Sequence, residues 1–90
     1  MNSAENFAQE SFHPDGRIEI VSRRSRRKLL IELGTTRSLQ GALLHLSGLP
    51  RSMNITINQM FSGRWDPVTR TWTVPKSKGI ALRAYLAEHF

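Results

Sequence analysis

Alternating apolar and polar residues mark the first regular segments of the chain. Ile18 and Ile20 flank a glutamate, and residues 29–33 repeat the pattern with two leucines and an isoleucine on one side. A period of two places every second side chain on the same face of a β-strand. Because only the polar segment "SRRSRR" lies between the two runs, we predict a β-hairpin over residues 17–33. A helix over residues 22–33 with its leucines directed inward is the alternative.

The apolar spacing then changes to the period of a helix. The i, i+3, i+4, i+7 spacing of an amphipathic helix is formed by Leu39, Ala42, Leu43 and Leu46. We therefore predict a helix over residues 39–47, ended by Gly48 and Pro50. Residues 51–61 fit both a strand and a helix, and we favour a helix that stops before Gly63.

Both tryptophans of the chain lie in the stretch "RWDPVTRTWTVP". Asp66 followed by proline is favoured at the first two positions of a type I turn. If Trp65 pairs with Trp72, the loop consists of residues 67–70 and both rings lie on one face of a hairpin. The last predicted element is a helix capped by Ser77. Its stripe is formed by Leu82, Tyr85, Leu86 and His89.

These elements predict one small α+β domain over residues 17–90, with β-hairpins packed on two or three helices. Residues 1–16 lack periodicity and end in the turn signal "HPDG", so we predict a disordered acidic tail there. A winged helix is the alternative architecture for the domain.

The charge of the chain indicates a polyanionic partner. Thirteen Lys and Arg residues face seven Asp and Glu residues, which gives a formal net charge of +6. Three of the acidic residues and none of the basic ones lie in residues 1–16, so residues 17–90 carry a formal +9. A small domain with this excess of positive charge attracts nucleic acids.

Other classes of protein find little support in the sequence. The chain has no cysteine, and its three histidines lack the spacing of metal ligands. We therefore predict no metal, no cofactor, no catalytic residue and no enzymatic activity. Neither a membrane-spanning run nor a targeting segment is evident, so we expect a cytoplasmic protein without a membrane partner.

Two groups of basic residues are the candidate contacts to nucleic acid. The first group is Arg23, Arg24, Arg26, Arg27 and Lys28. The second group, which surrounds the tryptophans, is Arg51, Arg64, Arg70, Lys76 and Lys78. If the two groups share a face, they form a basic groove suited to single strands. Trp65 and Trp72 either stack on bases there or form part of the hydrophobic core, and one ring could do each.

The tryptophan hairpin resembles the hairpin of the HARP domain, the accessory module of annealing helicases. The residues that carry this resemblance are Trp65, Asp66, Thr69, Arg70, Trp72 and Val74. The same hairpin contains an aromatic-Asp-Pro…Trp-x-x-Pro unit. This unit is similar to one in small domains of plasmid and mobile-element proteins. The resemblance implies binding to DNA, including branched or single-stranded DNA.

Residues 39–74 also resemble a winged helix-turn-helix. In that comparison residues 39–47 form the first helix, residues 51–61 the recognition helix and residues 64–74 the wing. The resemblance implies DNA binding and would favour a homodimer.

We therefore expect a nucleic-acid-binding protein with an accessory or regulatory role, which contacts phosphates through arginines and prefers DNA to RNA as its partner. The alternative is a protein-interaction module, antitoxin-like or directed against a defence system, that docks on an acidic protein surface.

Overall fold

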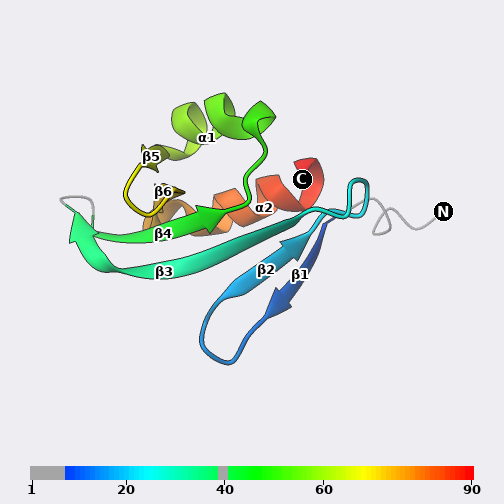
Figure 1. The fold of residues 1–90 in the computed structure, drawn as a ribbon, viewed down its shortest axis with the longest axis horizontal. Coiled ribbons are helices and arrows are strands. Elements are labelled where there is room, and N and C mark those ends of the chain that lie inside the picture. Colours follow the sequence, from blue (N-terminus) through cyan, green and yellow to red (C-terminus); the bar gives the residue numbers. More distant parts are fainter. Residues whose placement is uncertain (1–7, 39–40) are drawn as a thin grey trace.

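The fold is a six-stranded antiparallel sheet with two α-helices packed on one of its faces (Figure 1). The computed structural model describes residues 8–38 and 41–90. The sheet has the strand order β1-β2-β3-β4-β6-β5. In chain order the elements are β1 (Gln9–Phe12), β2 (Ile18–Val21), β3 (Lys28–Ser38), β4 (Gly41–Ser47), η2 (Arg51–Met53), α1 (Asn54–Phe61), β5 (Arg64–Asp66), β6 (Thr71–Pro75), η3 (Lys76–Lys78) and α2 (Gly79–His89). This arrangement confirms the predicted α+β class.

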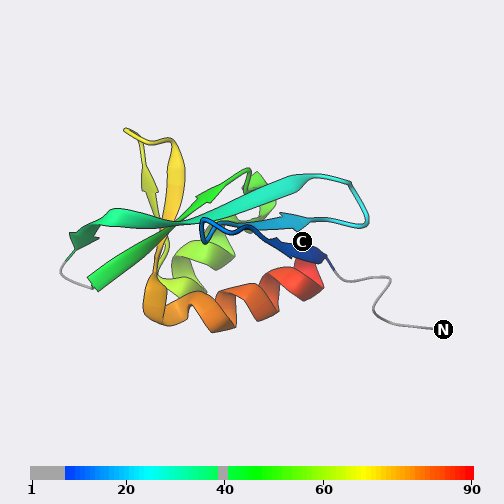
Figure 2. The ribbon, with the colours of Figure 1, turned by 90° about the horizontal axis from the view of Figure 1, so that it is seen from below.

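A single hydrophobic core lies between the sheet and the two helices. Its buried members are Ile20, Leu29, Ile31, Leu46, Met53, Ile57, Phe61, Val74, Leu82 and Leu86. Residues four apart in each helix, such as Ile57 and Phe61 in α1, share one face and point into this core. The rings of Phe61 and Tyr85 lie 5.5 Å apart and join the two helices. Figure 2 shows α1 and α2 on the same side of the long strands.

The opposite face of the sheet is free of helices in the part of the chain that the structure describes (Figure 2). Side chains alternate between the two faces of a strand. Because Ile20, Leu46 and Val74 point into the core, their neighbours Glu19, His45 and Thr73 point to this uncovered side. We call it the open face.

The predicted hairpin over residues 17–33 is confirmed, and the alternative helix over residues 22–33 is wrong. Strands β2 and β3 pair with Ile20 opposite Leu29. The loop closes with a hydrogen bond from the backbone N–H of Ser22 to the carbonyl oxygen of Arg27. Lacking a glycine, the loop places Arg26 in the left-handed region, with φ of 59°.

The predicted helix over residues 39–47 is wrong, because Gly41–Ser47 forms the strand β4. Residues 39 and 40 lie outside the described residues. Strand β4 pairs with β3 on one edge and with β6 on the other. Side chains alternate along the strand, so Leu44 packs against the core and Leu43 lies on the open face. The winged-helix alternative fails at the same point, since its first helix would occupy this strand.

The predicted tail also needs correction, because Gln9–Phe12 forms the edge strand β1, paired with β2. Residues 1–7 lie outside the described residues. Glu10 accepts a 2.7 Å hydrogen bond from Nε of Arg83 in α2. The Arg83 guanidinium also lies 5.0 Å from the centre of the Phe12 ring. These contacts to α2 hold a polar segment in the sheet that its own sequence pattern does not predict.

The predicted helices at residues 51–61 and at the C-terminus are confirmed as η2 with α1 and as α2. The predicted cap at Ser77 is wrong: Ser77 lies within η3, and no side chain caps the start of α2. Helix α1 ends at Ser62, whose φ of 55° is left-handed. The N–H of Gly63 then donates to the carbonyl oxygen of Ile57, which turns the chain into β5.

Candidate nucleic-acid interface

A cleft of about 400 Å³ lies between the β5–β6 hairpin and the start of α1. We call it the tryptophan cleft. Its wall includes two aromatic rings, two guanidinium groups and one side-chain amide. These belong to Trp65, Trp72, Arg51, Arg70 and Asn54, and Gly48 lies at its border. The residues come from β4, η2, α1 and the hairpin, so only the tertiary fold assembles them.

The hairpin positions both tryptophans at this cleft with the predicted register. Trp65 pairs with Trp72, and Asp66 pairs with Thr71. The two ring centres are 6.2 Å apart, and the planes are inclined by 59°. Trp72 packs against the core, whereas Trp65 is 51% exposed. Of the two roles considered for these rings, Trp72 therefore contributes to the core and Trp65 presents a surface ring.

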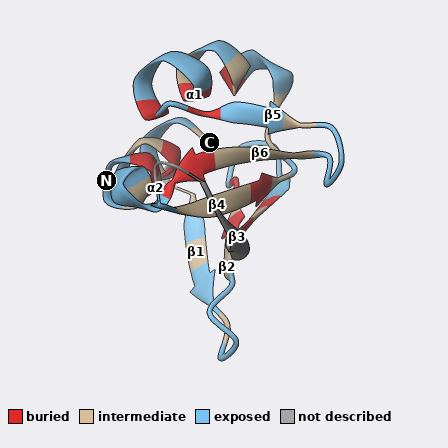
Figure 3. Ribbon diagram, turned by 90° about the vertical axis from the view of Figure 1, so that its left-hand side faces the viewer, coloured by how far each residue is buried: buried red, intermediate tan, exposed pale blue. Residues whose placement is uncertain are grey.

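Asp66 organises the turn of the hairpin. Its carboxylate accepts hydrogen bonds from the backbone N–H of Val68 and from the Thr69 hydroxyl, each at 3.0 Å. The backbone hydrogen bond from Val68, followed by the one from Thr69, lowers the pKa of Asp66 below its ordinary value. The carboxylate is thus ionised at neutral pH and holds the turn closed. This turn is the exposed end of the hairpin in Figure 3.

Arg70 is held in an unusual backbone conformation by hydroxyl groups on both sides. Its φ is 56°, in the left-handed region that side chains other than glycine rarely adopt. The hydroxyl oxygens of Thr69 and Thr71 lie 2.7 Å apart and so bracket Arg70. Nδ1 of His45 lies 3.0 Å from the same Thr71 oxygen. A chain of polar contacts therefore runs from His45 on β4 to Asp66 and stabilises the arch that carries Arg70.

The opposite wall of the cleft carries an unsatisfied acceptor. Asn54 is the first residue of α1, and its Oδ1 atom is buried without a hydrogen-bond partner among the described residues. A buried polar atom without a partner costs about 1–3 kcal/mol. Sequence reasoning did not select Asn54. It is one of four polar residues among residues 53–61, so the pattern there does not single it out.

The predicted first group of basic residues lies elsewhere. Its four arginines occupy the β2–β3 loop, which we call the arginine loop; they are Arg23, Arg24, Arg26 and Arg27. All four are exposed, and none forms an ion pair within residues 8–38 and 41–90. The arginine loop and the β5–β6 turn lie toward opposite ends of the molecule in Figures 1 and 2. The arginine loop therefore does not meet the second predicted group in one groove.

The second predicted group is itself divided. Only Arg51 and Arg70 line the tryptophan cleft. Arg64 borders a separate cavity beyond the end of α1. Lys76 and Lys78 are exposed in η3, which follows the end of β6 that lies away from the β5–β6 turn. Lys28 begins β3, and its Nζ atom lies 3.7 Å from the carboxylate of Glu19 on the open face.

Comparison with known proteins assigns no relative to this chain. No family model matches it, no curated protein matches its sequence, and no solved structure matches its fold. A function is therefore inferred from the geometry of the site. Among the described residues, no helix is both long and apolar enough to cross a membrane.

Proposed function

We propose that the protein binds single-stranded nucleic acid, with a base against Trp65 and the neighbouring phosphates on Arg51 and Arg70. The observation that carries this proposal is the half-exposed ring of Trp65 in a cleft whose charged side chains are two arginines. Bases of any sequence have an aromatic face, and arginine presents a planar set of donors to a phosphate. A single strand can offer both groups at once, whereas paired bases are stacked inside a duplex.

The magnitudes favour a short strand over a single nucleotide. Stacking of one base on an aromatic side chain contributes about 1–3 kcal/mol. Each phosphate contact adds an electrostatic contribution that weakens with salt. One stacked base and two phosphate contacts give weak binding, so useful affinity needs further contacts along the strand. The arginine loop supports the proposal at longer range, because its unpaired charges attract a polyanion toward the protein.

The wider role that fits these features is that of an accessory or regulatory DNA-binding protein. The resemblance of the hairpin to HARP domains makes forked DNA the branched substrate to compare with a plain single strand. An RNA of matched sequence separates the two kinds of nucleic acid, because bases and phosphates are common to both.

The proposal is tested by fluorescence anisotropy with labelled single-stranded, duplex and forked DNA and a matched RNA at two salt concentrations. Tryptophan quenching is recorded in parallel. We expect single strands to bind more tightly than the duplex, with quenching. Trp65→Ala should remove most of the quenching and weaken binding about 5- to 150-fold. Phe12→Ala is the matched control, because Phe12 is an exposed aromatic residue of β1 that does not line the cleft.

Two results would contradict the proposal. Equal affinity of Trp65→Ala and the wild type would mean that the ring does not contact the ligand. A complete lack of binding at low salt would favour the other class of function, a protein-interaction module whose arginine loop docks on an acidic protein surface.

A further inference from the structure

A second cleft, also of about 400 Å³, lies on the open face of the sheet. Its polar wall is formed by His13, Arg17, Glu19 and Lys28, and its floor includes Leu30 and Gly48. We call it the open-face cleft. Gly48 borders this cleft and the tryptophan cleft alike. The tryptophan cleft lies on the helix side of the sheet and the open-face cleft on the other side, and both reach the end of β4, where the chain turns toward η2.

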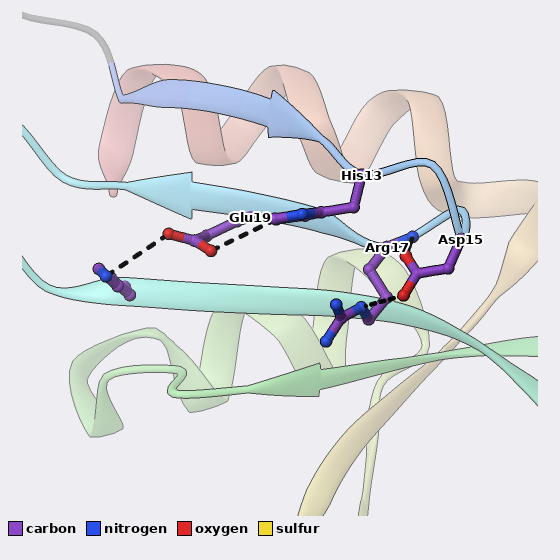
Figure 4. A network of polar contacts seen from close by, with 5 residues as sticks. His13, Asp15, Arg17 and Glu19 are labelled. Carbon is purple, nitrogen blue, oxygen red and sulfur yellow. Dashed lines mark hydrogen bonds and ion pairs between the residues drawn. The ribbon is translucent and has the colours of Figure 1, made fainter.

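The open-face cleft holds its charges in weak pairs. The Glu19 carboxylate lies 3.4 Å from Nε2 of His13 and 3.7 Å from Nζ of Lys28, while Nε of Arg17 lies 2.7 Å from Asp15. Figure 4 shows Glu19 directed toward His13, and the Arg17–Asp15 pair at the neighbouring turn. The side chain of Lys28 is 71% exposed. Exposed pairs of this kind contribute about 0–1 kcal/mol, so Lys28 can leave Glu19 for another anion at little cost.

Glycine at position 48 lets the ends of β3 and β4 lie close together. A Cβ atom at this position would lie 2.4 Å from the carbonyl oxygen of Lys28. The absence of that atom lets the end of β4 lie directly beside the start of β3. Strand spacing and rise place Lys28 roughly 14 Å from Trp72 and roughly 17 Å from Trp65, which lies one strand farther away. A nucleotide on Trp65 cannot cover that distance, whereas a strand of a few nucleotides can.

We infer that the open-face cleft is a second phosphate subsite, and that one strand runs from Trp65 around the end of β4 at Gly48 to Lys28 and Arg17. The inference rests on the proposed function and adds the course of the strand. In the free protein the Lys28 ammonium group pairs with the Glu19 carboxylate, and an incoming phosphate replaces that carboxylate. Arg17 contributes a guanidinium with five N–H donors, more than the carboxylate of Asp15 can use. Glu19 therefore restrains binding, and its removal should tighten the complex.

The test measures affinity against length with oligo-dT and oligo-U of one to eight nucleotides, read by tryptophan quenching. We expect affinity to rise with length until about four nucleotides span both clefts. Lys28→Glu should weaken the eight-nucleotide probe about fivefold or more and leave the dinucleotide unchanged. Glu19→Gln should tighten the longer probe about two- to fivefold, the range that corresponds to an exposed charge pair.

The matched control is Lys78→Glu, which makes the same charge change in η3, outside both clefts. Thermal unfolding of each variant shows that it is folded. The inference is overturned if dinucleotides bind with quenching but length adds nothing, or if Lys28→Glu and Lys78→Glu weaken binding equally; the proposed function then stands. If no probe of any length binds or quenches, the proposed function fails and this inference fails with it.

Discussion

Replacing Gly48 by alanine tests how tightly β3 and β4 are held at the end of β4 that both clefts reach. The backbone of Gly48 has φ of 89°, which costs an alanine about 1–2 kcal/mol. The new Cβ atom would also lie 2.4 Å from the carbonyl oxygen of Lys28, about 1 Å closer than an ordinary contact. That oxygen lies at the start of β3, which is paired with β2 through Val21 and Lys28 and with β4 through Leu30 and Ser47. A strand fixed on both sides cannot move away freely, and forced overpacking costs about 1–3 kcal/mol.

We therefore expect Gly48→Ala to lower the free energy of unfolding by about 2–5 kcal/mol in total. Gly16→Ala is the internal control, because Gly16 has φ of 92° and nothing within 4 Å of its would-be Cβ atom. The two variants share the conformational cost and the change in the unfolded chain. The difference between them, about 1–3 kcal/mol, isolates the steric contact with Lys28.

The assay is urea unfolding of both variants and the wild type, followed by tryptophan fluorescence. Equal m-values would show that the variants differ in stability and not in the surface exposed on unfolding. A Gly48→Ala variant no less stable than Gly16→Ala would refute the reasoning. It would mean that the end of β4 can shift away from β3 and make room for the added methyl group.

Three further predictions concern the tryptophan cleft and the hairpin turn beside it. Arg70→Gly should raise the free energy of unfolding by up to about 1 kcal/mol, because glycine accepts positive φ, and should weaken binding of single strands; thermal unfolding and anisotropy measure the two effects. Asp66 stabilises the fold through a lowered pKa, so its contribution is present above the unfolded pKa of about 4 and is lost as pH falls through the lower folded value. In acid titrations followed by circular dichroism, Asp66→Asn should lack this part of the decline. Asn54→Ala should leave the melting temperature unchanged or raise it, because it removes a buried acceptor without a partner. A fall of several degrees would mean that Oδ1 of Asn54 accepts a hydrogen bond in solution.

Local patterns in the sequence predicted the elements whose partners are close along the chain. The pairing of Trp65 with Trp72 follows from an Asp-Pro turn and a fixed loop length, and the structure has that register. The hairpin of β2 and β3 follows from two alternating runs around a polar loop. Helices α1 and α2 follow from apolar residues spaced by one turn. In each case the chain within about 20 residues contains the interactions that decide the structure.

The sequence was misleading where the deciding partner is distant. Residues 39–47 have the spacing of a helix, but β3 and β6 offer hydrogen-bonding edges to both sides of Gly41–Ser47, and a strand satisfies both. Strand β1 has a polar sequence and is held by an edge of β2 and by Arg83, more than 70 residues away along the chain. Pairing with remote backbone outweighs a weak local preference in both places.

The candidate site divides in the same way. Residue types and net charge alone identified a basic protein with an exposed arginine loop and an aromatic hairpin. Only the tertiary structure separated the arginine loop from the hairpin, joined Arg51 and Asn54 to Trp65, and placed Gly48 between two clefts. Composition and periodicity record what each residue can do and which local structure it prefers. Which residues converge is decided by the order of the strands in the sheet, and that order depends on contacts between distant parts of the chain.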